Sequence, residues 1–462
     1  MDFNDDKRQN TRIKRDSGSA GQGEAQDRRA RGTESLLAIN EHESPANTDR
    51  MMEEICEWGN LKQAMWRVKA NKGSAGIDGM RVEELPDYRD LLGIRDQLLS
   101  GTYKPQPVKR VEIPKAAGGV RKLGIPTALD RWVQQAVMQV LQKHWDGTFS
   151  DSSYGFRPGR STQQAVAQAQ QHIAAGYGWV VDLDLEKFFD RVNHDKLMGE
   201  IAKRVGDKRL LKLIRAFLNA GVMENGLVSP SVEGTPQGGP LSPLLSNVVL
   251  DELDRELERR GHRFVRYADD CNIYVRSEQA GQRVMESIKN FITRRLKLKV
   301  NEAKSAVARP QVRKFLGFSV SNGPVIRRIL APQAIERFKG RIREIMQYGK
   351  GASFDQVMAK LAPYMRGWRG YFGFCETPEV LIQLTCWVRR RLRAALWRQW
   401  KTCGRRRTML LRLGVHRRLA TSTAASSRGP WPLSSTYALC IGLSNAYFRD
   451  RGLPALFGPC SV

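Results

Sequence analysis

Three aspartates in two separate segments could bind metal ions and support phosphoryl transfer. Asp269 and Asp270 lie between two apolar, β-rich runs, which predicts a hairpin with both carboxylates at its tip. Turns favour Asp, but two adjacent anions cost free energy unless a cation lies between them. In residues 179–185, Asp182 and Asp184 alternate with apolar side chains, so they share one face of a predicted strand. Mg²⁺ prefers such oxygen ligands, and two such ions suit an in-line displacement at phosphorus.

Regular elements must hold these carboxylates in place. Apolar residues at three- and four-residue spacing predict one amphipathic helix from about Met51; they are Ile55, Trp58, Leu61, Met65 and Val68. Residues 108–126 alternate on both sides of a turn at 116–119, which predicts a basic hairpin. Residues 1–50 have almost no apolar periodicity, so we expect a disordered extension there.

The charge of the chain indicates a polyanionic partner. Its 462 residues include 76 Lys and Arg against 48 Asp and Glu, a net charge of +28, and 22 basic against 5 acidic residues lie between positions 327 and 418. We expect the polyanion to be nucleic acid, because many weak phosphate contacts add up to tight, salt-sensitive binding. No apolar run approaches the ~20 residues of a membrane-spanning helix, and no signal peptide is recognisable. We therefore expect a cytoplasmic protein with no membrane partner.

In order and spacing, the motifs resemble those of the reverse transcriptases that bacterial group II introns encode. Residues 184–190 resemble polymerase motif A, residues 234–243 resemble motif B, and residues 267–270 resemble motif C. The resemblance implies two Mg²⁺ ions as cofactors. Their implied ligands are Asp184, the backbone carbonyl of Leu185, Asp269 and Asp270.

The resemblance also implies roles for residues around the incoming nucleotide. The implied dNTP-binding residues are Lys115, Arg121, Phe189, Gln237 and Gly238. Phe189 matches the aromatic residue that blocks a ribose 2′-hydroxyl, a task that needs only a filled volume. Lys304 matches the lysine that is placed to protonate the leaving pyrophosphate, and it completes the catalytic set with the three aspartates. Residues 315–318 resemble the hairpin that grips the primer.

The C-terminal third resembles the part of this family that handles intron RNA. Residues 366–373 resemble the signature of its helical thumb, called domain X, and residues 404–462 more weakly resemble a short DNA-binding region. The implied RNA-binding residues are Arg366, Arg369, Arg389, Arg390 and Arg393. The seven cysteines include no pair at zinc-knuckle spacing. The chain ends at Val462 without a His- and Cys-bearing nuclease, so it is similar to the endonuclease-lacking members, such as class C.

The resemblance implies an α+β right-hand polymerase with fingers, a ferredoxin-like palm and an α-helical thumb. The expected segments are an extension (1–50), an N-terminal block with fingers (51–135), the fingers and palm core (136–325), the thumb (326–403) and the C-terminal region (404–462). We expect an RNA-directed DNA polymerase that uses dNTPs, an RNA template and a DNA primer or target. In a ribonucleoprotein, it would also assist splicing and mobility of its group II intron RNA. The alternatives are a splicing-only RNA-binding maturase and a retron or defence-type reverse transcriptase.

Overall fold

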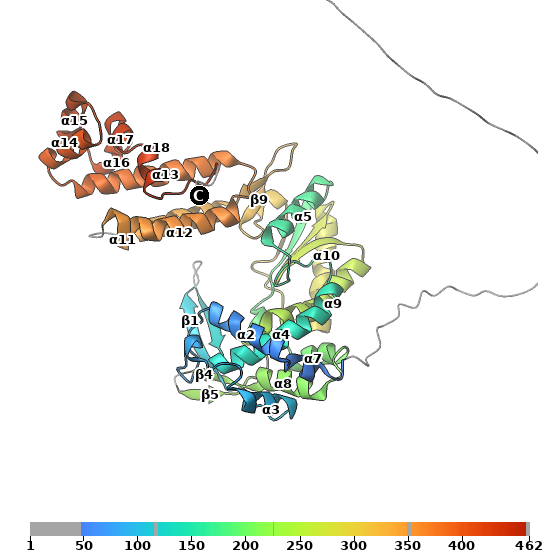
Figure 1. Ribbon diagram of the computed structural model, residues 1–462. Helices are drawn as coiled ribbons and strands as arrows, with labels where there is room; N and C mark the ends of the chain where they lie inside the picture. Colours follow the sequence, from blue (N-terminus) through green and yellow to red (C-terminus); the bar gives the residue numbers. More distant parts are fainter. Residues whose placement is uncertain (1–47, 115–118, 225, 349–352, 459–462) are drawn as a thin grey trace, which may run out of the picture. The chain divides into compact units, whose positions relative to one another are not determined.

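A four-stranded antiparallel sheet carries the segments with the three aspartates. The computed structural model describes residues 48–114, 119–224, 226–348 and 353–458 (Figure 1). The strands of this sheet are β3 (Trp179–Leu183), β6 (Arg263–Tyr267), β7 (Asp270–Val275) and β8 (Ala306–Ala308). Their order is β6-β7-β3-β8, and each neighbouring pair is antiparallel. With helices between β3 and β6 and between β7 and β8, this is the predicted ferredoxin-like palm.

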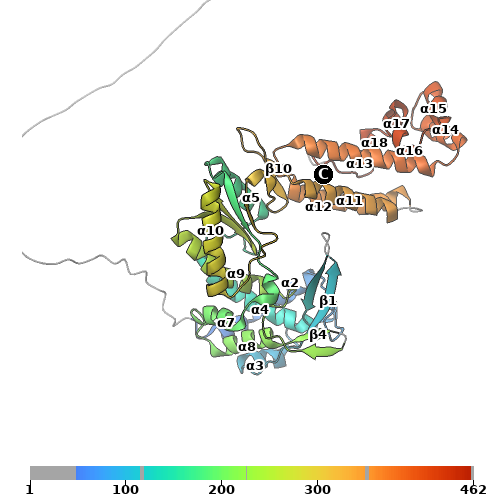
Figure 2. The ribbon, with the colours of Figure 1, turned by 180° about the vertical axis from the view of Figure 1, so that it is seen from behind.

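The two faces of the palm sheet are buried differently. On one face, Val181 and Leu183 join a core with helices α9 (Ser242–Arg259) and α10 (Glu278–Phe291), and Figure 2 shows α10 lying along the sheet. On the other face, Val180 packs with Tyr274 against helix α5 (Thr162–Ala174). Because side chains alternate along a strand, the alternation read from residues 179–185 is confirmed, and Asp182 lies on the α5 face.

The hairpin predicted around Asp269 is present, with one difference at its tip. Tyr267 pairs with Asp270, so the loop consists of Ala268 and Asp269 only. Asp270 is therefore the first residue of β7 and not a loop residue as predicted. The backbone therefore holds Asp270 more firmly than Asp269, because Asp270 is paired with Tyr267 in the β-ladder and Asp269 lies in the loop.

A second sheet contains the predicted basic hairpin. Its strands, in the order β2-β1-β4-β5, are β1 (Val108–Pro114), β2 (Val120–Ile125), β4 (Val222–Glu224) and β5 (Leu227–Ser229). Strands β1 and β2 are antiparallel, which confirms the hairpin. Most of its turn, with Lys115, lies outside the described residues, as does nearly all of the predicted extension at 1–50. The surrounding helices are α1 (Met51–Ile55), α2 (Trp58–Ala70), α3 (Leu92–Leu99), α4 (Ala128–Trp145), α6 (Phe188–Arg191), α7 (His194–Ala202) and α8 (Lys208–Asn219).

The single helix predicted from Met51 was wrong, because the chain forms two helices there. Helix α1 ends at Ile55, and Glu57 adopts an extended conformation before α2 begins. Trp58 does not share the buried stripe of Leu61 and is 41% exposed. Its ring instead lies near that of Tyr88. Equal spacing of apolar residues therefore concealed a change of direction in the backbone.

The C-terminal part is almost entirely helical and has its own core. Strands β9 (Phe318–Val320) and β10 (Arg328–Leu330) form an antiparallel ribbon before it. The helices are α11 (Pro332–Tyr348), α12 (Phe354–Phe372), α13 (Pro378–Gln399), α14 (Cys403–Arg412), α15 (Arg417–Ala424), α16 (Pro430–Leu433), α17 (Tyr437–Gly442) and α18 (Asn445–Asp450). Phe338, Trp368 and Trp397 are buried in their shared core. In the described part of the chain, no helix is long and apolar enough to cross a membrane.

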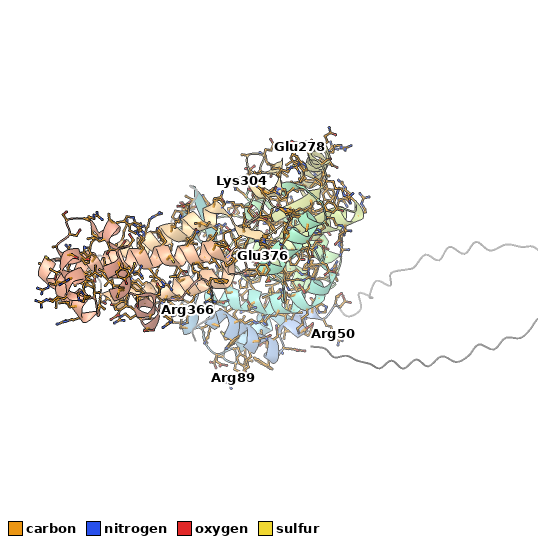
Figure 3. All side chains as sticks on the ribbon, turned by 90° about the horizontal axis from the view of Figure 1, so that it is seen from above. Arg50, Arg89, Glu278, Lys304, Arg366 and Glu376 are labelled. Carbon is orange, nitrogen blue, oxygen red and sulfur yellow. The ribbon has the colours of Figure 1, made fainter. Side chains whose placement is uncertain are left out.

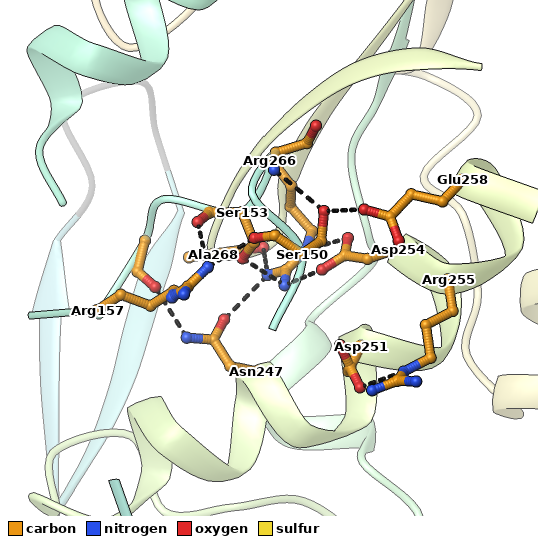
Figure 4. Close-up of polar contacts among 12 residues, drawn as sticks. Ser150, Ser153, Arg157, Asn247, Asp251, Asp254, Arg255, Glu258, Arg266 and Ala268 are labelled. Carbon is orange, nitrogen blue, oxygen red and sulfur yellow. Dashed lines mark hydrogen bonds and ion pairs between the residues drawn. The ribbon is translucent and has the colours of Figure 1, made fainter. Parts of the chain in front are cut away.

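A fully buried ion pair ties β6 to its surroundings (Figure 4). The guanidinium of Arg266 donates to both carboxylate oxygens of Asp254, at 2.7 and 2.5 Å. It also donates to the amide oxygen of Asn247 at 3.0 Å and to the hydroxyl of Ser153 at 2.7 Å. Both members of the pair have no exposed surface. Such a pair is sustained only by complete hydrogen bonding, because two desolvated charges are costly.

We predict that Arg266→Met destabilises the protein by about 3–5 kcal/mol, because it leaves Asp254 buried without a counter-charge. The double variant Arg266→Met, Asp254→Leu should recover part of this loss, since no charge then stays unpaired. Chemical denaturation measures both effects. Arg259→Met is the control, because Arg259 forms its ion pair in an exposed position, where an ion pair contributes little to stability. A single variant as stable as the wild type would contradict this account.

Candidate active site

The ends of two adjacent strands bring two of the predicted ligands close together. Leu183, the last residue of β3, pairs with Cys271. Asp184 and Asp270 are the next residues beyond this pair, and they are close enough for the charge of Asp184 to act on Asp270. Asp269 is in the adjoining loop, so the fold gathers the three carboxylates that the sequence had singled out.

The backbone on both sides of Leu185 is fixed by a second segment. The amide of Asn301 donates to the carbonyl of Asp184 at 2.8 Å, and the amide of Glu186 donates to the carbonyl of Lys299 at 2.8 Å. Leu185 itself is buried in the core below. The Leu185 carbonyl, a ligand implied by the resemblance, therefore lies in a backbone segment that is held by hydrogen bonds on both sides.

The gathered carboxylates change the acidity of Asp270. Desolvation, together with the negative charges of Asp269, Asp182 and Asp184, raises its pKa to about 7. The side chain nevertheless stays open to the cleft, so water screens part of this effect. The direction follows from the geometry alone, because like charges close together disfavour the ionised form. This end of the sheet therefore favours a proton or a cation.

Two predicted basic residues act on the same carboxylates. The pKa of Asp269 is raised by desolvation and by the charge of Asp184, whereas the charges of Arg121 and Lys304 lower it. Arg121 lies on β2, so the basic hairpin faces the aspartates. Lys115, its predicted companion, lies outside the described residues.

Lys304 forms an ion pair with one of the three aspartates. Its ammonium nitrogen is 2.9 Å from the carboxylate of Asp184, and its side chain is 68% exposed. Asp182, on the same strand face, has a different partner, because Arg313 donates to its carboxylate from two nitrogens, at 2.8 and 2.5 Å. That pairing gives Asp182 a structural role and agrees with its omission from the predicted ligands.

The loop at Asp269 is braced by residues that the sequence did not identify as functional. The guanidinium of Arg266 donates to the carbonyl of Ala268 at 3.0 Å, directly before Asp269. Ala268 has a positive φ of 57°, a conformation that costs free energy outside glycine. A Cβ on Gly155 would overlap the backbone of Ala268, so only glycine fits there. The sequence offers one signal for this brace, since residues 154–161, which include Gly155, also resemble a string of the same family.

The predicted nucleotide-binding loop packs against the basic hairpin. The amide of Gly124, on β2, donates to the carbonyl of Gln237 at 3.0 Å. Gly238 has a φ of 143°, and a Cβ there would lie 2.7 Å from the carbonyl oxygen of Gly124. Thr235 donates its amide to the carbonyl of Phe189 at 2.7 Å. These contacts bring Gln237, Gly238 and Phe189 to the same region of the backbone; their roles stay predictions.

A large cavity opens beside the aspartates. It has a volume of about 1120 Å³, and its lining includes Asp184, Asp270 and Lys304. Other lining residues come from the predicted primer hairpin and the first thumb helices: Phe315, Leu316, Gly317, Arg337, Trp368 and Tyr371. The Tyr371 hydroxyl donates to the carbonyl of Leu316 at 3.0 Å and ties helix α12 to that hairpin. The cavity is therefore bounded by polar palm residues and by aromatic thumb residues.

The five arginines predicted to bind RNA lie in different surroundings. Arg366 is exposed on α12 (Figure 3), and Arg389 is partly buried on α13. Arg390 donates to the Ser434 hydroxyl at 3.3 Å and lies over the Trp431 ring.

The other two of these arginines hold C-terminal carbonyls. Arg393 is buried and donates to the carbonyl of Leu443 at 2.9 Å. Arg369 donates to the carbonyl of Ala455 at 3.1 Å and to that of Gly458. Arg369 and Arg393 thus have intramolecular partners that join the C-terminal region to the thumb, and we do not carry them into the proposed RNA surface.

Comparison with known proteins gives two family matches. Residues 113–320 match the family described as reverse transcriptase (RNA-dependent DNA polymerase). Residues 335–414 match the maturase-specific domain of group II introns. The first match contains all three aspartates, and the second contains the signature at 366–373.

Curated relatives agree with these matches. Protein YkfC of Escherichia coli is 39% identical over 44% of this chain and 55% of its own length. The group II intron-encoded protein LtrA of Lactococcus lactis is 32% identical over 49% of this chain and 49% of its own. The Retron Mx65 reverse transcriptase of Myxococcus xanthus is 28% identical over 61% of this chain and 71% of its own.

The chain spans about half the length of the first two of these relatives. The polymerase match places the three aspartates in a reverse transcriptase domain, and the maturase match separates the chain from a polymerase domain alone. The chain therefore combines a reverse transcriptase domain with a group II intron maturase-specific domain that follows it, and it is homologous to group II intron-encoded proteins such as LtrA.

Proposed function

We propose that this protein is an RNA-directed DNA polymerase that also binds group II intron RNA, assists its splicing and supports its mobility. The observation that carries the proposal is the gathering of Asp184, Asp269 and Asp270 at one end of the palm sheet, beside Lys304 and a large cavity. A complete set of carboxylates supports polymerisation over a splicing-only maturase. The maturase match favours the intron-encoded assignment over a retron enzyme.

The donor set at this end of the sheet fits Mg²⁺. Its donors are carboxylate and carbonyl oxygens, the ligands that Mg²⁺ prefers. As the side chains of the described residues stand, no group of three or more His, Cys, Asp or Glu is arranged to hold a metal ion, and Lys304 pairs with Asp184 in that arrangement. Desolvation and the neighbouring carboxylates raise the pKa of Asp270, so a bound cation would offset the cost of its ionised form. Asp184, Asp269, Asp270 and the Leu185 carbonyl would hold two ions.

When bound, these ions would neutralise charge on the 3′-hydroxyl and triphosphate oxygens during an in-line displacement. The residues of the chain do the remaining work. Arg121, and Lys115 beyond the described residues, would bind the triphosphate, since guanidinium and ammonium groups both bind phosphate oxygens. Lys304 would donate a proton to the leaving pyrophosphate, for which its exposed ammonium has free access to the cavity.

Selection of deoxynucleotides would depend on a filled volume beside the sugar. Phe189 is half-buried and packs edge-on against Phe188, with ring centroids 5.3 Å apart. This packing limits its movement, so it could exclude a 2′-hydroxyl by contact alone. Gln237 and Gly238 would lie against the nucleotide and the template.

The basic thumb would bind the intron RNA. Arg366, Arg389 and Arg390 are the members of the predicted set that we retain for this role. The segment boundaries near residues 325 and 403 are part of the proposal. So are the partners, which are intron RNA, an RNA template, a DNA primer or target, and dNTPs.

We predict that Asp270→Asn lowers primer extension on an RNA template by more than about 100-fold. Loss of a residue that only hydrogen-bonds to a metal ligand typically lowers metal affinity or activity by about 10- to 100-fold, and loss of the ligand itself should have a larger effect. Asp195→Asn is the matched control, because the Asp195 carboxylate is 83% exposed and pairs with Arg215 away from the cleft. Extension by Asp270→Asn at the rate of the control would refute the site assignment.

A second prediction concerns pH in the absence of metal. The raised pKa of Asp270 means that the folded protein holds a proton between about pH 4 and 7 where the unfolded chain has lost it. Stability should therefore fall as pH rises through this window. In EDTA, the melting temperature of Asp270→Asn should exceed that of the wild type, with a larger difference at pH 8 than at pH 5. Mg²⁺ should reduce the difference, and a difference independent of pH would argue against charge crowding at this site.

A further inference from the structure

Three guanidinium groups gather at a small pocket on the thumb, outside the polymerase cleft. The pocket has a volume of about 230 Å³ and is lined by Arg343 of α11, Arg391 and Arg398 of α13, and Trp431 of α16. Arg391 and Arg398 are seven residues apart, so they lie on one face of the helix. The remaining lining residues are Met346, Gln347, Ala394 and Ala395. The lining therefore contains no carboxylate.

The positive charges at this pocket are not compensated from within the described chain. None of the three arginines forms an ion pair with a described Asp or Glu, and the Nε of Arg391 is buried without a hydrogen-bond acceptor. Burial lowers the pKa of Arg391, and the charges of Arg343 and Arg398 lower it further. Like charges brought together cost free energy. The uncompensated positive charge of this pocket therefore favours the binding of an anion.

Aromatic rings fix the arginines in place. The Arg391 guanidinium lies 4.8 Å from the ring centroid of Trp387 and 5.6 Å from that of Trp431. The Arg343 guanidinium lies 5.6 Å from the centroid of the same Trp387 ring. Such contacts orient a guanidinium without neutralising it, so its forked N–H donors stay available for a phosphate.

We propose that this pocket binds a phosphodiester group of a nucleic-acid strand, with Arg343, Arg391 and Arg398 as the phosphate ligands and Trp431 as an apolar wall against the adjoining nucleoside. Planar, bidentate donors match phosphate oxygens. Trp431 is 39% exposed, and a partly exposed aromatic ring beside a basic groove is the arrangement that single-stranded nucleic acid uses. The proposal rests on the proposed function only in taking nucleic acid as the ligand.

The test compares variants in binding to fluorescent RNA and DNA single strands of the same sequence, in EDTA and over a range of salt concentrations. Arg343→Gln combined with Arg398→Gln removes the two exposed arginines. It should weaken binding by about tenfold and make the slope of log K against log salt shallower by about one. Whether the variant binds only RNA, only DNA or both more weakly than the wild type identifies the strand that supplies the phosphate.

Two controls separate a specific pocket from general electrostatics. Arg283→Gln combined with Arg294→Gln removes the same charge from exposed positions on the palm side of the chain and should weaken binding less. Ala395→Phe fills the pocket without changing charge and should weaken binding as the arginine variant does, with melting temperatures confirming that each variant is folded. Equal effects of the two arginine pairs, or wild-type binding by Ala395→Phe, would overturn the proposal. Binding in EDTA is independent of polymerisation, so failure of primer extension would not decide this test.

Discussion

Mutual repulsion among Asp184, Asp269 and Asp270 is the constraint around which the palm is built. Carboxylates this close favour a proton or a cation, and desolvation together with the neighbouring negative charges raises the pKa of Asp270. Holding them together therefore requires stabilisation from elsewhere. Two of them directly adjoin the last pair of the β3–β7 ladder, and the buried guanidinium of Arg266 fixes the loop that carries the third. A strained loop at a functional site is tolerated when its surroundings over-determine it.

Local sequence patterns predicted those elements that depend mainly on the residues within them. The alternation in residues 179–185 revealed both faces of β3, because strand burial repeats every two residues. The same reasoning failed at Met51, where apolar spacing continued through a break between α1 and α2. The hairpin tip was predicted one residue too far along the chain, since nothing in the sequence shows that Asp270 is already paired with Tyr267.

The brace around Ala268 could not be predicted from the sequence, because its contacts are distant along the chain. Arg266 reaches Asp254 and Asn247 at separations of 12 and 19 residues, and Ser153 at 113. Contacts between distant residues also decide the role of positive side chains in the thumb. Arg393 looked like part of a nucleic-acid surface, yet its guanidinium holds the carbonyl of Leu443, 50 residues away. Charge alone does not distinguish a ligand-binding arginine from one that joins two segments.

Direct measurement of cation binding tests the central claim most sharply. Mn²⁺ accepts the same oxygen ligands as Mg²⁺ and can be titrated by electron paramagnetic resonance into the wild type, Asp184→Asn and Asp182→Asn. The two variants remove the same charge from one strand face, but Asp182 is already paired with Arg313. We expect tight Mn²⁺ binding to be retained in Asp182→Asn and lost in Asp184→Asn. Equal binding by all three proteins, or loss in Asp182→Asn alone, would contradict the account.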